Sequence, residues 1–93
     1  MQKITISEMR NAIGYVQGRG NQLHEISDEK LMKSDFMQDF GMGNIRLANV
    51  VVELERIYNT SFPRELFQLV KDGTVGALLE VLNRYIEEKN NAD

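Results

Sequence analysis

Residues 40–54 read FGMGNIRLANVVVEL, and this stretch decides the fold because a glycine-rich turn runs directly into an apolar segment. Gly41 and Gly43 favour the turn, since glycine adopts backbone conformations that other residues avoid. Apolar residues then recur at three- and four-residue spacing, which predicts a helix over residues 44–58. Asn44 can cap that helix through its side-chain oxygen. We therefore expect a loop-to-helix junction at Asn44, followed by the most buried helix of the protein.

The valine run at 50–52 has the local propensity of a strand, but its neighbours Leu47, Leu54 and Ile57 keep helical spacing. The residues that suit an exposed edge of the same helix are Glu53, Glu55 and Arg56. Counting Arg46 as well, this helix carries equal numbers of acidic and basic residues, so we expect a neutral surface.

A first helix is expected to begin at Thr5, which precedes Glu8 at the spacing of a capping box, and to stop at the glycines of residues 18–20. Residues 21–43 then form a long connection, with a short turn expected near residues 27–31. The apolar residues predicted to pin this connection to the core are Leu23, Ile26, Leu31, Met32, Phe36, Met37 and Phe40.

Two more helices follow residue 58. Pro63 fits the start of a short helix over residues 64–70, because its missing amide is harmless there. Thr74 caps a last amphipathic helix, whose tail from Lys89 is expected to fray. The pattern predicts an all-α fold: a four-helix bundle with a long first loop and a short third helix.

Composition narrows the classes of function. The chain has 93 residues, no cysteine and a net charge of -3, so we expect one domain over residues 1–93, without disulfides or thiol chemistry. A nucleic-acid partner is disfavoured because phosphate binding needs a basic face. No secretory signal or membrane-spanning apolar run is visible, so we expect a cytoplasmic monomer without membrane contact.

Residues 24–40 are locally acidic, which fits a solvated loop or a surface for a basic partner. The acids are Glu25, Asp28, Glu29, Asp35 and Asp39.

These elements together resemble the acyl carrier protein family, including its peptidyl carrier relatives. Four groups of residues carry the resemblance. Phe36, Asp39, Phe40 and Gly41 resemble the family's Phe-x-x-Asp-Leu-Gly lead-in, and Leu54, Glu55 and Tyr58 resemble the end of its second helix. Phe62 and Pro63 are similar to its Ile-Pro pair, and Thr74 and Val75 fall where its last helix begins. The resemblance implies a carrier-type four-helix bundle over nearly the whole chain.

In that family a Gly-x-Asp-Ser-Leu motif presents the serine that carries 4'-phosphopantetheine. The matching positions here are Gly41, Met42, Gly43, Asn44 and Ile45. Asn44 has a carboxamide in place of the hydroxyl, so it cannot form the phosphodiester. The resemblance therefore places the cofactor position at Gly41, Gly43, Asn44 and Ile45 but predicts that no cofactor is attached. Met42 and Arg46, beside that position, are predicted to contact a partner, unless Met42 is core filler.

The leading hypothesis is a non-enzymatic docking module without a prosthetic group. Its partner would be an acyl-transfer or ligase enzyme of fatty acid, polyketide or peptide metabolism. The alternative is a genuine phosphopantetheine carrier that uses another hydroxyl, with Ser34, Thr60 and Ser61 the nearest in sequence. A helical interaction protein unrelated to acyl transfer stays open. An enzyme built on His24 is disfavoured, since no nucleophile or metal-ligand spacing accompanies it.

Overall fold

The computed structural model describes residues 2–18, 23–70 and 72–91, and within them the protein is mostly helical with no strand. The all-α prediction is confirmed. The elements are α1 (Ile6–Gln17), α3 (Asp28–Lys33), α4 (Phe36–Phe40), α5 (Asn44–Tyr58), the 3₁₀ helix η1 (Arg64–Leu69) and α6 (Val75–Asn91).

Helix α1 begins and ends as predicted. The Thr5 hydroxyl oxygen accepts a hydrogen bond from the Glu8 amide at 3.1 Å. Gly18 closes the helix in the left-handed conformation, with φ of 71°, which glycine adopts without steric cost. Residues 19 and 20 of the predicted stop signal lie outside the described residues.

Helix α5 has the predicted bounds, and the valine run is helical. Two expectations about it are wrong. Gly43 is the N-cap and makes no side-chain capping bond, so Asn44 lies one position too far along the helix to act as the cap. Nor is α5 the most buried helix: it buries Val50, Val51, Glu53 and Leu54, whereas the shorter α1 buries more residues.

The expected long loop contains two short helices. The Ser27 hydroxyl caps α3 by accepting from the Lys30 amide at 3.2 Å. The Asp35 carboxylate caps α4 by accepting from the amides of Met37 and Gln38, each at 2.9 Å. Of the predicted apolar anchors, Leu23, Leu31 and Phe36 are buried, and Ile26, Met32 and Phe40 pack partly against the core. Met37 is 59% exposed, so its predicted anchoring role is wrong.

The last two helices follow the predicted order. Pro63 precedes η1, which is a 3₁₀ helix. The Thr74 hydroxyl caps α6 by accepting from the Ala77 amide at 3.2 Å. α6 continues through Asn91, so the predicted fraying does not occur at residues 89–91, and residues 92–93 lie outside the described part.

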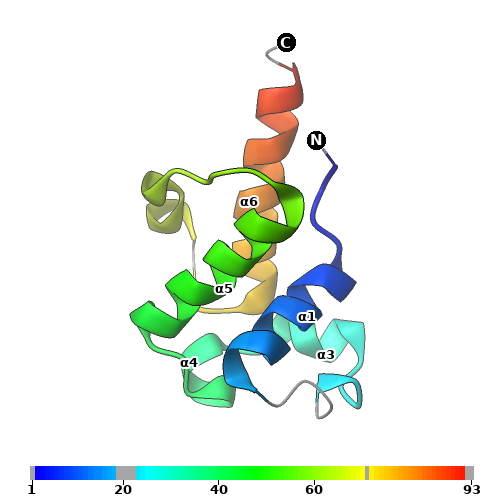
Figure 1. The fold of residues 1–93 in the computed structure, drawn as a ribbon. Coiled ribbons are helices and arrows are strands. Elements are labelled where there is room, and N and C mark those ends of the chain that lie inside the picture. Colours follow the sequence, from blue (N-terminus) through cyan, green and yellow to red (C-terminus); the bar gives the residue numbers. More distant parts are fainter. Residues whose placement is uncertain (1, 19–22, 71, 92–93) are drawn as a thin grey trace.

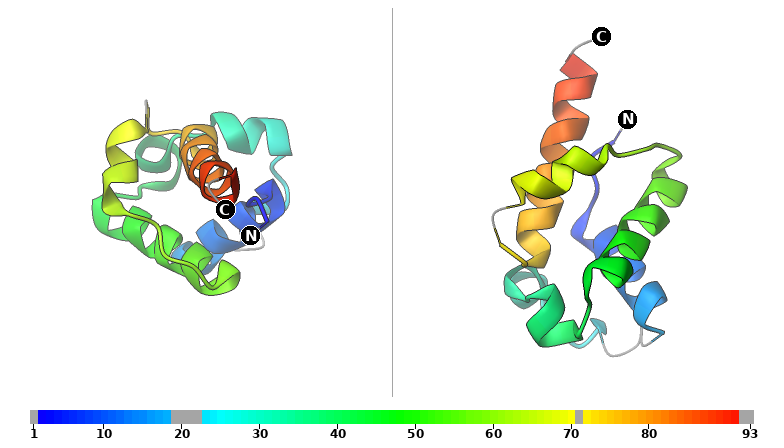
Figure 2. Two further views of the ribbon diagram at one scale, coloured as in Figure 1. Left: turned by 90° about the horizontal axis from the view of Figure 1, so that it is seen from above. Right: turned by 90° about the vertical axis from the view of Figure 1, so that its left-hand side faces the viewer.

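Helix α6 is the central helix of the bundle. Seen along its axis, α6 is surrounded by the other helices, and its C-terminal turns extend beyond them (Figures 1 and 2). It packs against α3 and η1, while α1 packs against α5. Helices α3 and α6 approach each other closely at Gly76, where an added Cβ would lie 2.8 Å from the Met32 carbonyl oxygen. The segment before α1 is tied to α6 as well, because Asn83 exchanges two hydrogen bonds with the backbone of Ile4, at 2.7 and 3.0 Å.

A buried arginine holds the connection after α1 in place. Arg10 of α1 is 9% exposed, and its guanidinium donates to the carbonyl oxygens of Leu23 and Ile26 and to the Asp28 carboxylate. These partners lie on both sides of the turn that leads into α3. Arg10 therefore fixes the path of the chain between α1 and α3.

Candidate functional site

The turn that leads into α5 is closed by backbone hydrogen bonds. The Gly41 amide donates to the Met37 carbonyl at 2.9 Å, and the Met42 amide donates to the Phe36 carbonyl at 2.8 Å. Gly41 has φ of 64°, a left-handed conformation that requires glycine or a costly substitute. This geometry turns the chain back sharply after α4 and places Asn44 at the start of α5.

Of the two interpretations of Met42, the structure bears out core filler over a partner contact. Its side chain is only 2% exposed and belongs to the core, so it anchors the turn and cannot contact a partner. Ile45, in contrast, is 82% exposed, and Asn44 and Arg46 are exposed beside it. The predicted surface thus consists of residues 44–46 without Met42.

Gly43 has ordinary extended backbone and room for a side chain. A Cβ added there would meet only Met37 Cε, at 3.7 Å, which is normal van der Waals contact. Packing therefore leaves room for a Cβ at residue 43.

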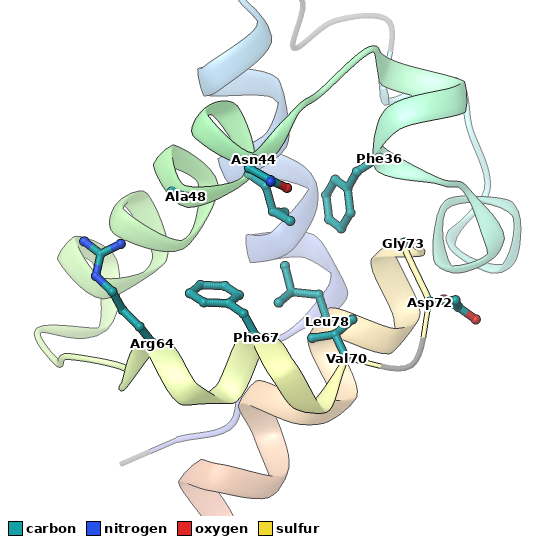
Figure 3. A pocket seen from close by; sticks show the side chains of 10 residues that line it. Phe36, Asn44, Ala48, Arg64, Phe67, Val70, Asp72, Gly73 and Leu78 are labelled. Carbon is teal, nitrogen blue, oxygen red and sulfur yellow. The ribbon is translucent and has the colours of Figure 1, made fainter.

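Asn44 stands at the edge of an apolar cavity of about 450 Å³ between α5, η1 and the start of α6. Phe36, Phe67 and Leu78 point toward one another across it (Figure 3). Its lining also includes Leu47, Ala48, Val70 and Gly73. The cavity thus has an apolar interior with a carboxamide at its edge.

Two charged residues border the cavity. Arg64 extends from η1 toward α5, next to Ala48, whereas the Asp72 carboxylate points away (Figure 3). Asp72 accepts hydrogen bonds from the hydroxyl and amide of Thr74, at 2.5 and 2.9 Å, which lower the pKa of Asp72. No sequence signal marks Arg64 or Phe67, because their place at the cavity depends on how η1 packs beside α5.

The charges of α5 balance by count, but its acidic and basic side chains are not equally available to a partner. Glu53 is 8% exposed and accepts a hydrogen bond from Arg56 at 2.5 Å. This hydrogen bond, with a smaller contribution from the Arg56 charge, lowers the pKa of Glu53 against the opposing effect of burial. Glu55 accepts from the Phe62 amide at 2.7 Å and is half-buried. Both carboxylates are thus engaged within the protein, whereas Arg46 is exposed and makes no ion pair in the described structure.

The acidic residues of the connection are also engaged. Asp28 pairs with Arg10, and Glu29 lies 3.4 Å from Lys33. Asp35 caps α4, and Asp39 accepts from the Asp35 amide at 2.6 Å. Four of the five acids therefore have a local structural role. This favours a solvated loop over a docking surface for a basic partner.

The other candidate residues differ in how accessible they are. Ser34 is 8% exposed and donates its hydroxyl to the Lys30 carbonyl at 2.9 Å, so it is inaccessible to a transferase. Thr60 is half-buried, and Ser61 and His24 are exposed. Within residues 2–18, 23–70 and 72–91, no group of three His, Cys, Asp or Glu side chains could hold a metal ion.

None of the helices in the described part of the chain has the length and apolar character needed to cross a membrane. Comparison of the chain with protein-family models, with curated proteins and with solved structures gives no match. The function is therefore argued from the residues around Asn44.

Proposed function

We propose that this protein is a carrier-type helical module that carries no phosphopantetheine at Asn44 and acts by docking on a partner protein, an enzyme of acyl metabolism. The observation that carries the proposal is the position of Asn44. It is the first residue of a 15-residue helix, it is exposed, and it borders an apolar cavity. The order of a long first helix, a helix that begins at the attachment position, a short helix and a long last helix also supports a carrier-type bundle.

The side chain at this position excludes the usual modification. Attachment of phosphopantetheine needs a hydroxyl oxygen that becomes bonded to phosphorus. The Asn44 carboxamide offers a carbonyl oxygen and an amide nitrogen, and neither replaces that hydroxyl. The free amides at the start of α5 favour a nearby anion, but a helix terminus alone does not tether one.

Docking is supported by what is exposed beside Asn44. Ile45 is the most exposed of the large hydrophobic side chains in the described residues, at 82%, and it adjoins the charged Arg46. An apolar residue next to an arginine is a common composition at the centre of protein interfaces. The start of α5 is therefore proposed as the contact surface.

The proposed absence of phosphopantetheine is tested by intact mass spectrometry of the protein purified from its native host. We expect the mass of the unmodified chain. A gain of about 340 daltons, the mass of a phosphopantetheinyl group, would overturn the proposal and favour attachment at another hydroxyl.

The carrier-type bundle is tested by restoring the motif. We expect the double variant Gly43→Asp, Asn44→Ser to gain a phosphopantetheinyl group from coenzyme A and a broad-specificity transferase, because residue 44 is exposed and residue 43 has room for the aspartate. The wild-type chain and Gly43→Asp alone are matched controls and should stay unmodified. A folded double variant that is not modified would contradict the carrier-type assignment.

A further inference from the structure

We propose that the outward face of α5 binds an acidic amphipathic helix of the partner protein. This face, called the cationic face below, consists of Ile45, Arg46, Asn49 and Val52 of α5 with Arg64 of η1. The inference rests on the docking role proposed above and adds the chemistry of the partner.

The apolar part of the cationic face is a stripe along the helix. Ile45 and Val52 are seven residues apart, which places them on the same side of α5, two turns from one another. They are 82% and 55% exposed, and the exposed Asn49 lies between them. The opposite side of α5 buries Val50 and Leu54. The spacing of the two exposed side chains suits the apolar stripe of a second helix.

Arginines flank this stripe on both sides. Arg46 lies on the same side of α5 as Glu53, which follows it by seven residues, or about two turns. Arg64 lies on the other side, since it lines a cavity of about 190 Å³ together with Val52 and Ala48. The stripe is thus bordered by a guanidinium at each edge.

These two guanidiniums are available for an external partner. Among the arginines in the described part of the chain, Arg10, Arg56 and Arg84 each pair with a carboxylate, whereas Arg46 and Arg64 have no ion pair. Both are exposed. An unpaired arginine beside an apolar stripe fits a carboxylate of the partner, which it can bind with two parallel hydrogen bonds.

Nearby acidic residues have other partners. Glu53 is paired with Arg56, and Glu55, which lines the same cavity as Arg64, accepts from the Phe62 amide and forms no ion pair with Arg64. Glu65 is exposed on η1, but in a 3₁₀ helix it points about 120° away from Arg64. The cationic face therefore attracts acidic surfaces and repels basic ones.

An acidic helix fits better than other anionic partners. Binding to nucleic-acid phosphates or to an anionic membrane needs many basic contacts, whereas the cationic face offers two unpaired arginines, Arg46 and Arg64, which suffice for a few carboxylates. The apolar stripe also follows a helical repeat and borders a helix of 15 residues, the length of about four turns. A partner helix with apolar residues at that repeat and glutamates on its flanks matches both features.

The test uses two synthetic peptides of about 18 residues, long enough to form a helix when bound. Both have leucines at helical spacing, one with glutamates on its flanks and the other with lysines. NMR titration of the isotope-labelled full chain should show amide shifts around Ile45, Val52 and Arg64 with the glutamate peptide. We expect this peptide to bind at least about fivefold more tightly than the lysine peptide.

Charge reversal identifies the side chains responsible. Arg46→Glu and Arg64→Glu should each weaken binding of the glutamate peptide about threefold to tenfold and strengthen binding of the lysine peptide. Arg84→Glu on α6 is the matched control and should leave both affinities unchanged, with circular dichroism verifying that all variants fold.

Three results would overturn the inference: equal affinity for the two peptides, amide shifts confined to other surfaces, or concentration-dependent dimerisation that blocks peptide binding. Each of them would leave the intact-mass result unaffected. A phosphopantetheine adduct, conversely, would overturn the proposed function without deciding which peptide the cationic face prefers.

Discussion

The connection between α1 and α5 and the outward face of α5 make opposite use of charged side chains. In the connection, four acidic residues bond to backbone amides or to nearby cations. On the face of α5, Arg46 and Arg64 make no ion pair in the described structure. The difference shows that a count of charges does not identify a binding surface. What matters is whether each charge is already engaged within the fold.

The largest effect predicted from this comparison is for Arg10→Ala. The substitution removes the guanidinium that binds the carbonyls of Leu23 and Ile26, and it leaves these groups without their donor. We expect a loss of about 3 kcal/mol in the free energy of unfolding, measured by urea denaturation. Arg46→Ala is the control, with an expected change below about 0.5 kcal/mol because its side chain is exposed. Equal losses for the two variants would contradict the proposed division of roles.

A smaller loss is expected for Asp35→Ala. This carboxylate accepts from the amides of Met37 and Gln38 at the start of α4. Removing a cap of this kind costs about 1 kcal/mol. Chemical denaturation should show this loss, and Glu25→Ala, an exposed acid of the same segment, should show almost none. If both variants lose equally, the acids act through their overall charge and not as caps.

A gain in stability is expected for Gly43→Asp. The N-cap of α5 makes no side-chain bond, its backbone is extended, and an added Cβ has ordinary contact distances. An aspartate should cap the helix and interact with its dipole, which raises the free energy of unfolding by about 0.5 kcal/mol. Thermal and urea denaturation measure this gain. Destabilisation would show that the turn before α5 tolerates no side chain at residue 43.

The smallest effect is a pH dependence due to Glu53. Since its pKa is lowered in the folded protein, its contribution is present above the ordinary pKa of a glutamate and is lost as the pH falls through the folded value. The stability difference between the wild type and Glu53→Gln should therefore shrink from pH 7 to pH 3. Glu88→Gln on the exposed end of α6 serves as the control, with no such change. If the stability difference between the wild type and Glu53→Gln stays constant from pH 7 to pH 3, this interpretation is contradicted.

The long helices were predictable because their signals are local. Thr5, Thr74 and Gly18 mark helix ends by their own chemistry, and the spacing of apolar residues in α5 overrides the strand propensity of its valines. Helices α3 and α4 have six and five residues, which is too short for a repeat to appear. Their capping residues Ser27 and Asp35 were the only available signal.

The candidate site was predicted in part. Sequence placed the start of α5, because the glycine-rich turn and the helical spacing that follows mark it. It left two interpretations of Met42 open, since a methionine in a glycine-rich turn gives no sign of which way it points, and it did not predict that Ile45 is 82% exposed. Arg64 and the engaged state of Glu53 and Glu55 depend on tertiary contacts and on how η1 packs beside α5.

The bonds between Ile4 and Asn83 bring the first described residues alongside α6, so both ends of the described chain lie on the same side of the bundle (Figures 1 and 2). The start of α5 lies at the other end. A linker or a surface tether attached to either end would therefore leave residues 44–46 accessible. Immobilised protein, or the same module fused to another domain, should present this surface to a partner without obstruction.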